Sequence, residues 1–375
     1  MIHSAISCNL DADILEAALP LLEASEVEAL EWSFDTLYKS GGMPPWFEAL
    51  LDAFGREGRL VGHGVYFSLF SGRWSEDQAK WLAELGRLSD QFQFNHITEH
   101  FGFMTGENFH AGAPVSIPFT KATLAIGQDR LKRIQQVCRR PVGLENLAFA
   151  YSIEAVKVHG EFLEQLVAPV NGFIILDLHN LYCQLHNFGV DFAEMIRLYP
   201  LDRVREIHIS GGSWEDATAQ PGRRIRRDTH DDSVPDEVFR LLENTIPMCP
   251  NLKFAVLEQL GAGLKTEASK VAFRGDFRKM AAIIRRHNPT DNLSGINEFA
   301  SKIEMPEGPP LEDEVLYGQQ RELSYILENA ADATTAENLL CKSSLAKTDW
   351  RIEDWDPAML ETAVRIARKW RRGFV

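Results

Sequence analysis

The sequence predicts an α/β protein, a closed (β/α)8 TIM barrel with a C-terminal helical extension. Eight short runs rich in apolar and β-branched residues lie between residues 5 and 260, and a helix-compatible stretch follows each of them. Strands that alternate with helices favour a parallel sheet, and eight such units fit a closed barrel. An open doubly wound sheet is the alternative, but no glycine-rich phosphate fingerprint follows an early strand.

The expected strands are short and end at polar or turn residues, as buried parallel strands do. We expect helices at residues 75–90, 153–168, 235–246 and 267–287. The first begins with a Ser-x-x-Gln cap signal, and Pro235 suits the first position of the third. We expect strands at residues 5–10, 29–34, 59–65, 92–100, 141–147, 172–178, 204–210 and 253–260.

The pattern changes after about residue 290, where linker-like stretches rich in Pro, Gly and acid appear. Two amphipathic helical patterns follow, RELSYILENA and PAMLETAVRIARKWRRGF. We therefore expect a barrel domain over residues 1–290 and a linker with a small helical extension over residues 291–375. The extension either packs on the barrel or docks a partner, and the sequence leaves both open.

Composition excludes several classes of protein. The net charge of −15 disfavours a general nucleic-acid binder, because phosphate contacts need a basic face. No window approaches 18 apolar residues and no secretion signal stands at the N-terminus, so we expect no membrane span and a cytoplasmic protein. The 5 cysteines show no C-x-x-C spacing, which suits a reducing compartment and argues against a thiolate metal cage.

The stretch GFIILDLHNLYCQLHNFG, residues 172–189, carries the first functional signal. Its apolar run ends in Asp177, and Asn180 follows closely. A carboxylate at the exit of a buried strand must be paired or bound to metal. Either residue also suits a helix cap, and this segment alone does not decide between the two.

Other expected strands end in the same way. A lone strand-end histidine is more often a hydrogen-bonded core group, and a lone carboxylate often caps a helix. In a barrel, however, all these side chains meet at the carboxyl ends of the strands. The candidate metal ligands are His63, His100, Glu145, Asp177, Asn180, His208, Asp228, His230 and Glu258.

Imidazole, carboxylate and amide donors without a thiolate suit iron, manganese or zinc. Nine candidates exceed what one ion binds, so two or three ions that share a carboxylate are expected, since metal charge offsets the repulsion between acids. Glu145, in the middle of the strand order, is the candidate bridge. Zinc here would polarise a phosphate and activate water, whereas redox-active iron would activate oxygen.

The chain resembles the multinuclear non-heme iron-dependent oxidative enzymes, the family that includes the methanobactin-biosynthesis oxidase. The resemblance covers residues 5–287, and the motifs stand in the family's order. They are GHGVYFSL around His63, TEHFGF around His100, LENLAF around Glu145, LDLHNLY around Asp177 and Asn180, EIHISGG around His208, DTHDDSVPDEVF around Asp228 and His230, and LEQL at Glu258.

The resemblance implies a barrel that holds two or three irons, in mixed valence, and uses dioxygen as co-substrate. It implies that His63 and His100 bind one iron with Glu145 bridging, and that Asp177, His208 and Glu258 bind a second. Asn180, Asp228 and His230 would bind a third, more labile ion. Glu145, Asp177 and His208 are the residues expected to be catalytic. The implied substrate is a cysteine-containing precursor peptide, which family members usually receive from a partner protein.

The sequence departs from the family pattern at three places. Phe188 stands where many members carry a histidine, and His186 is the nearest substitute. His179 stands where many members carry a second asparagine, and Gln259 replaces an acidic residue after Glu258. These changes bear on the third ion.

A basic run at residues 223–227 directly precedes Asp228. It is either a solvated loop or a holder of an acidic peptide or phosphate.

Three hypotheses follow. The first is an iron-dependent, oxygen-using oxidase or oxygenase that modifies a cysteine of a ribosomally made peptide. The second is a zinc hydrolase resembling endonuclease IV, or a related isomerase. The third is a non-catalytic metal-dependent binding protein whose tail docks a partner.

Overall fold

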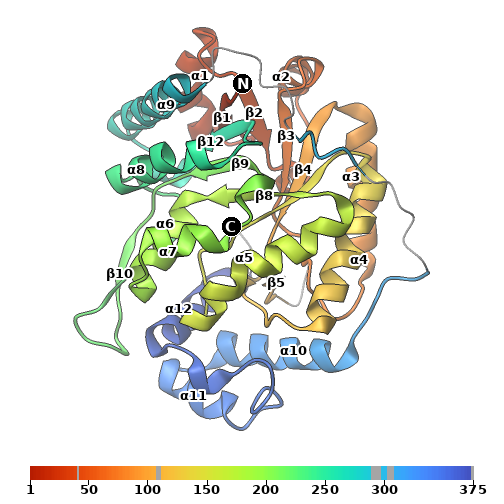
Figure 1. Ribbon diagram of the computed structural model, residues 1–375, viewed down its shortest axis with the longest axis vertical. Coiled ribbons are helices and arrows are strands. Elements are labelled where there is room, and N and C mark those ends of the chain that lie inside the picture. Colours follow the sequence, from red (N-terminus) through yellow and green to blue (C-terminus); the bar gives the residue numbers. More distant parts are fainter. Residues whose placement is uncertain (40–41, 107–110, 289–296, 302–307, 373–375) are drawn as a thin grey trace.

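Eight parallel strands close into a barrel at the centre of the molecule (Figure 1). The computed structural model describes residues 1–39, 42–106, 111–288, 297–301 and 308–372. The strand order around the ring is β1-β12-β9-β8-β7-β4-β3-β2, and β1 pairs with both β12 and β2, which closes the ring. The predicted fold class is therefore confirmed, and the open sheet is excluded.

Each expected strand run overlaps one observed strand, which is shorter than the run; seven runs contain their strand, whereas β1 begins two residues before the run at 5–10. All eight barrel strands run in the same direction, because every pairing around the ring is parallel. The barrel strands are β1 (His3–Ser7), β2 (Ala29–Trp32), β3 (Leu60–Gly64), β4 (Phe94–His100), β7 (Val142–Glu145), β8 (Phe173–Asp177), β9 (Val204–Ile209) and β12 (Phe254–Leu257).

A helix follows every barrel strand, and the expected caps are present with one correction. Ser75 and Gln78 form the capping box that begins α3. Pro235 is not the first helical residue but the residue before it, because α8 begins at Asp236. The barrel helices are α1 (Ala12–Glu23), α2 (Pro45–Arg56), α3 (Glu76–Gln91), α4 (Lys121–Cys138), α5 (Ile153–Val167), α6 (Leu178–Phe188), α7 (Phe192–Met195), α8 (Asp236–Thr245) and α9 (Glu267–His287).

Two short antiparallel hairpins interrupt the loops at the carboxyl ends of the strands, and the sequence did not predict them. One pairs β5 (Phe103–Met104) with β6 (Pro114–Val115). The other pairs β10 (Trp214–Asp216) with β11 (Arg224–Arg226) and takes up part of the basic run. Residues 224–226 are therefore strand rather than loop, although the Arg224 side chain is exposed.

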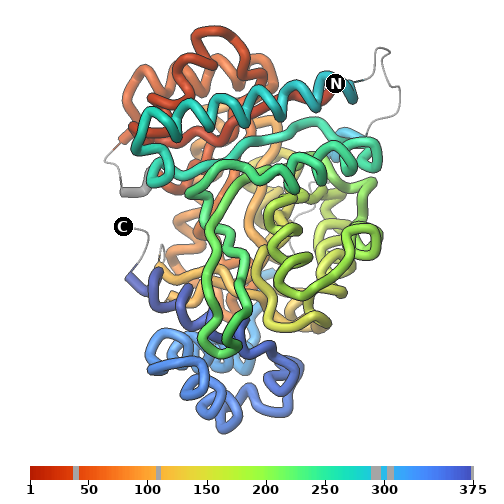
Figure 2. The backbone as a smooth tube through the Cα atoms, turned by 90° about the vertical axis from the view of Figure 1, so that its left-hand side faces the viewer, coloured from red at the N-terminus to blue at the C-terminus, as the bar shows by residue number. Residues whose placement is uncertain are grey.

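The extension forms α10 (Glu314–Asn329), α11 (Ala333–Leu340) and α12 (Pro357–Trp370), which gather at one end of the molecule (Figure 2). Gln320 accepts a hydrogen bond from the Gly72 amide and donates one to the Phe70 carbonyl, in the loop after β3. The Asp356 amide donates to the carbonyl of Tyr151, in the loop after β7.

Further contacts reach the two hairpin loops. The Gly112 amide donates to the Trp370 carbonyl, and the Ala219 amide donates to Glu361. The extension therefore packs on loops at the carboxyl ends of β3, β4, β7 and β9, the face where barrel enzymes carry their sites. The expected boundary near residue 290 lies outside the described residues, so the two-domain division stays a prediction. No helix in the described ranges is long and apolar enough to cross a membrane.

Candidate metal centre

The predicted ligands project from one face of the barrel. Because the strands are parallel, their carboxyl ends open together, and side chains carried there converge. Asn180 lies in the first turn of α6, while Asp228 and His230 follow β11. The others are His63 on β3, His100 at the end of β4, Glu145 at the end of β7, Asp177 at the end of β8, His208 on β9 and Glu258 directly after β12.

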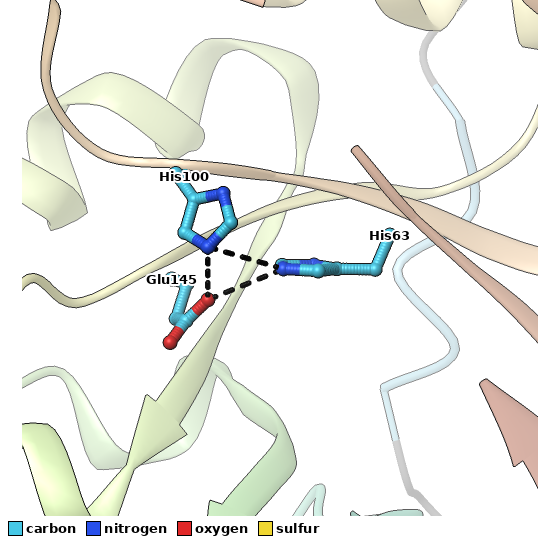
Figure 3. A group of neighbouring side chains, drawn as sticks. All are labelled: His63, His100 and Glu145. Atoms are coloured by element: carbon cyan, nitrogen blue, oxygen red, sulfur yellow. Dashed lines mark hydrogen bonds and ion pairs between the residues drawn. The ribbon is translucent and has the colours of Figure 1, made fainter. Parts of the chain in front are cut away.

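His63, His100 and Glu145 form a triangle of facing donor atoms (Figure 3). The Nε2 atoms of the two histidines are 3.4 Å apart. The Glu145 Oε2 atom lies 3.4 Å from Nε2 of His63 and 3.3 Å from Nε2 of His100. Ligands about 2.1 Å from an ion at tetrahedral angles are about 3.4 Å apart, so the spacing fits a shared ion.

The surroundings of His63 direct a lone pair into this triangle. The Thr98 hydroxyl donates to the Gly62 carbonyl at 3.2 Å and lies 2.8 Å from Nδ1 of His63. Since its proton is used on Gly62, the hydroxyl accepts from Nδ1–H, and Nε2 is left unprotonated. Burial lowers the pKa of His63 well below its usual value and that of His100 to about 4. Both rings are therefore neutral at pH 7, as metal-binding imidazoles must be.

A second group joins Glu145 to Asp177, His208 and Glu258, and its donor atoms all lie within 4.8 Å of one another. All four side chains are buried. His208 Nδ1 lies 3.2 Å from Oε2 of Glu258. Glu145 belongs to both groups, which is the placement that a bridging carboxylate requires.

The buried acids of this group repel one another. Burial raises the pKa of Glu145 well above its usual value, and the Asp177 and Glu258 carboxylates raise it further. Burial, with Asp228 and Glu258, raises the pKa of Asp177 to about 7. Burial alone would lower the pKa of His208, but Glu258 and other acids raise it well above the usual value. A cation held here would relieve this repulsion.

Asp177 performs both roles that the sequence left open. Its Oδ1 accepts a hydrogen bond from the backbone N–H of Asn180 at 2.5 Å and so caps α6. Its Oδ2 is buried and has no hydrogen-bond partner among the described residues, and the same holds for Oδ1 of Asn180. The Asn180 amide nitrogen donates to Oε1 of Glu145 at 2.9 Å and to the Asn146 carbonyl at 2.8 Å. Two buried oxygens without donors fit a site for a metal ion.

The third predicted set is less open. His230 Nε2 lies 2.9 Å from Oδ1 of Asp228, and its Nδ1 lies 3.7 Å from Oε2 of Glu258. His230 has a positive φ of 51°, which is strained for a residue with a side chain. His230 therefore lies near Glu258 of the second group, but its closest partner is Asp228, with which it forms an ion pair.

Sequence reasoning missed a further layer of acids below His208. Glu31 on β2 lies 3.1 Å from Nε2 of His208, and Glu206 on β9 lies 3.2 Å from it. Glu206 also contacts His96 Nε2 at 2.6 Å. The signal was present, because Glu206 stands two residues before His208 and alternation places both on one face of the strand.

His186 does not take the place of the missing histidine. Its ring lies edge-on to Trp214, with centroids 4.4 Å apart, on the β10–β11 hairpin. The basic run largely serves the fold: Arg223 pairs with Asp356 of the extension at 2.7 Å, and Arg227 pairs with Glu215 at 2.5 Å.

Comparison with known proteins places this geometry in a family. The family described as RiPP precursor modification enzyme MbnB/TglH/ChrH matches residues 14–259. The chain belongs to this family. The match includes every predicted ligand and ends before the extension. Membership in the MbnB/TglH/ChrH family indicates an enzyme that modifies a ribosomally made precursor peptide.

Relatives and solved structures give further likenesses. A UPF0276 protein of Caulobacter vibrioides is 29% identical over 233 residues, covering 61% of this chain and 76% of the relative. A UPF0276 protein of Chromobacterium violaceum is 30% identical over 185 residues, covering 49% and 64%. The chain is also similar to the IolI protein with a bound zinc atom, at a TM-score of 0.49 and 10% identity, covering 76% of this chain and 99% of the other. For endonuclease IV of Thermus thermophilus these values are 0.46, 14%, 76% and 99%.

Proposed function

We propose that this protein is an iron-dependent, oxygen-using oxidase or oxygenase that modifies a cysteine of a ribosomally made precursor peptide. The observation that carries the proposal is the pair of donor groups that share Glu145, set in a peptide-modifying family. The groups contain imidazoles and carboxylates and no cysteine among the described residues, a donor set that suits iron.

The residues have distinct proposed roles. His63, His100 and Glu145 would hold one ion, and Glu145, Asp177, His208 and Glu258 a second. Iron held there would supply redox chemistry, passing electrons from the cysteine of the peptide to dioxygen. Asn180 orients Glu145 through its amide, and Thr98 keeps Nε2 of His63 free of a proton. Asp228, His230 and the Oδ1 atom of Asn180 offer a third, weaker position.

We propose that the extension borders the route by which the peptide reaches the donor groups. It packs on the loops that surround the carboxyl ends of four barrel strands, beside the donor groups. A peptide that reaches the centre would pass these loops. We propose that the extension contributes to peptide binding, alone or with a peptide-presenting partner.

Anaerobic isolation, metal quantification and Mössbauer spectroscopy test the proposal, together with incubation with cysteine-containing peptides encoded beside the gene. We expect at least two irons per chain and an oxygen-dependent change of peptide mass. Glu145→Ala should lose both the bound iron and the change of peptide mass, whereas His287→Ala, at the end of α9, should keep both. A protein that carries only zinc and changes no peptide mass would contradict the proposal and favour a hydrolase or isomerase.

A further inference from the structure

A chain of hydrogen bonds behind Asp228 begins at a buried arginine. Arg226 lies on β11 with 4% of its surface exposed, and its Nε donates to Nε2 of His179 at 3.1 Å. Nδ1 of His179 lies 2.9 Å from Oδ1 of Asp228. His179 is fully buried, so the protein itself supplies the hydrogen-bond partners of its ring.

The two neighbours of His179, Arg226 and Asp228, determine which ring nitrogen carries the proton. A guanidinium group has only donors, so Nε2 of His179 must accept and the ring proton must sit on Nδ1. Nδ1–H then donates to Oδ1 of Asp228. With the tautomer reversed, two N–H groups would face each other at Arg226, and Asp228 would lose its donor.

Arg226 is itself fixed in place. The Asn187 side chain accepts from the Arg226 amide at 2.8 Å and donates to its carbonyl at 3.0 Å. The guanidinium carbon lies 5.6 Å from the ring centroid of Tyr182 and 5.2 Å from that of Trp214. His179, Tyr182 and Asn187 all belong to α6, so one helix supplies three of the residues that contact Arg226.

We propose that Arg226 and His179 are positioning residues for an ion at Asp228. Arg226 holds Nε2 of His179, and Nδ1–H of His179 holds Oδ1 of Asp228, so that the carboxylate stays facing Nε2 of His230, which is 2.9 Å from Oδ1 and 3.1 Å from Oδ2. The proposal rests on the proposed function in one respect, namely that Asp228 is a metal ligand. Such outer hydrogen bonds fix the orientation of ligands, and their loss typically costs 10- to 100-fold in metal affinity.

The tautomer is measured first, in the metal-free full-length chain. Histidine labelled with ¹⁵N, with the His179 signals assigned through His179→Asn, should show Nδ1–H in the wild type. Arg226→Met should remove the donor to Nε2 and so shift the Nε2 signal of His179, while Asp228 keeps the proton on Nδ1. Arg224→Met, on the same strand but exposed, should leave that signal unchanged. A wild-type Nε2–H, or no shift in Arg226→Met, would overturn the proposal.

The second measurement is anaerobic titration with Fe(II) against a chelator. Arg226→Met should weaken the weakest Fe(II) site about 10- to 100-fold when residue 179 is histidine. It should have no further effect in the His179→Asn background, because an asparagine amide donates from about the place of Nδ1 and has no ring nitrogen for Arg226 to hold. Equal weakening in both backgrounds would show that Arg226 acts through packing on Trp214 and Tyr182, which overturns the positioning role.

The two measurements separate this proposal from the proposed function. A wild type that binds no Fe(II) contradicts the proposed function and the metal part of this inference. The tautomer measurement still decides whether the Arg226–His179–Asp228 chain operates as described.

Discussion

Glu145→Ala provides the sharpest test of the shared-carboxylate centre, with Asn180→Ala as its partner. Glu145 belongs to both donor groups, so its loss leaves the first with two protein donors and the second with three. Asn180 contributes an amide that orients Glu145 and one unpartnered oxygen. We expect Glu145→Ala to abolish binding at both groups and Asn180→Ala to weaken it.

The magnitudes follow from binding linkage. A ligand at 100 times its dissociation constant stabilises the folded state by about 2.7 kcal/mol, so two ions stabilise it by about 5 kcal/mol. Glu145→Ala should lose nearly all of this metal-dependent stabilisation. Asn180→Ala removes an orienting hydrogen bond, so we expect affinity to fall about 10- to 100-fold, which is about 1.4–2.7 kcal/mol.

The metal-free proteins should rank in the opposite order. Burial and neighbouring acids raise the pKa of Glu145, so its removal relieves repulsion and should leave the metal-free chain at least as stable as the wild type. Asn180→Ala leaves the buried Asn146 carbonyl without its donor and should cost about 1–3 kcal/mol.

Urea unfolding with and without Fe(II) under anaerobic conditions, combined with metal analysis, measures both quantities. Equal metal loss in Glu145→Ala and Asn180→Ala would refute the shared carboxylate. A metal-free Glu145→Ala protein that is much less stable than the wild type would refute the repulsion argument.

Three further predictions concern single contacts. Thr98→Val removes the acceptor for Nδ1–H of His63, so Fe(II) affinity should fall about 10- to 100-fold, and an unchanged chelator competition would contradict this. Gln320→Ala leaves a buried amide and a buried carbonyl of the β3 loop unpaired, so stability should fall by about 2 kcal/mol in urea unfolding; a loss under about 0.5 kcal/mol, the size typical of a surface change, would be the contrary result. Burial raises the pKa of Asp276 from 3.8 to about 6, so its stabilising contribution is complete below 3.8 and is lost as pH rises through 6. Asp276→Asn should therefore match the stability of the wild type below pH 3.8 and exceed it above pH 6. A stability difference that does not vary with pH would disprove the raised pKa of Asp276.

The convergence of the strand-end residues could be predicted because two signals coincide at each of them. Asp177 ends an unbroken apolar run, and Glu145 ends a short run that parallel topology aims at the same face. Spacing along the sequence says little about distance in the fold, but a barrel converts position on a strand into position in space.

Glu31 and Glu206 could not be identified in the same way, because they lie within strands rather than at their ends. Their burial depends on which face of each strand turns inward, which follows from register across the ring. The tautomer of His179 lies even further from the sequence. It depends on β11, a strand of three residues whose pairing with β10 leaves no periodic signal.

The candidate metal ligands and the C-terminal extension lie in different parts of the chain. All predicted ligands lie within residues 14–259, the range that matches the family. The helices α10 to α12 lie outside that range, yet buried hydrogen bonds such as those of Gln320 attach them to loops beside the centre. If the extension contributes to peptide binding as proposed, peptide selectivity should change when the extension is altered, while metal binding should not.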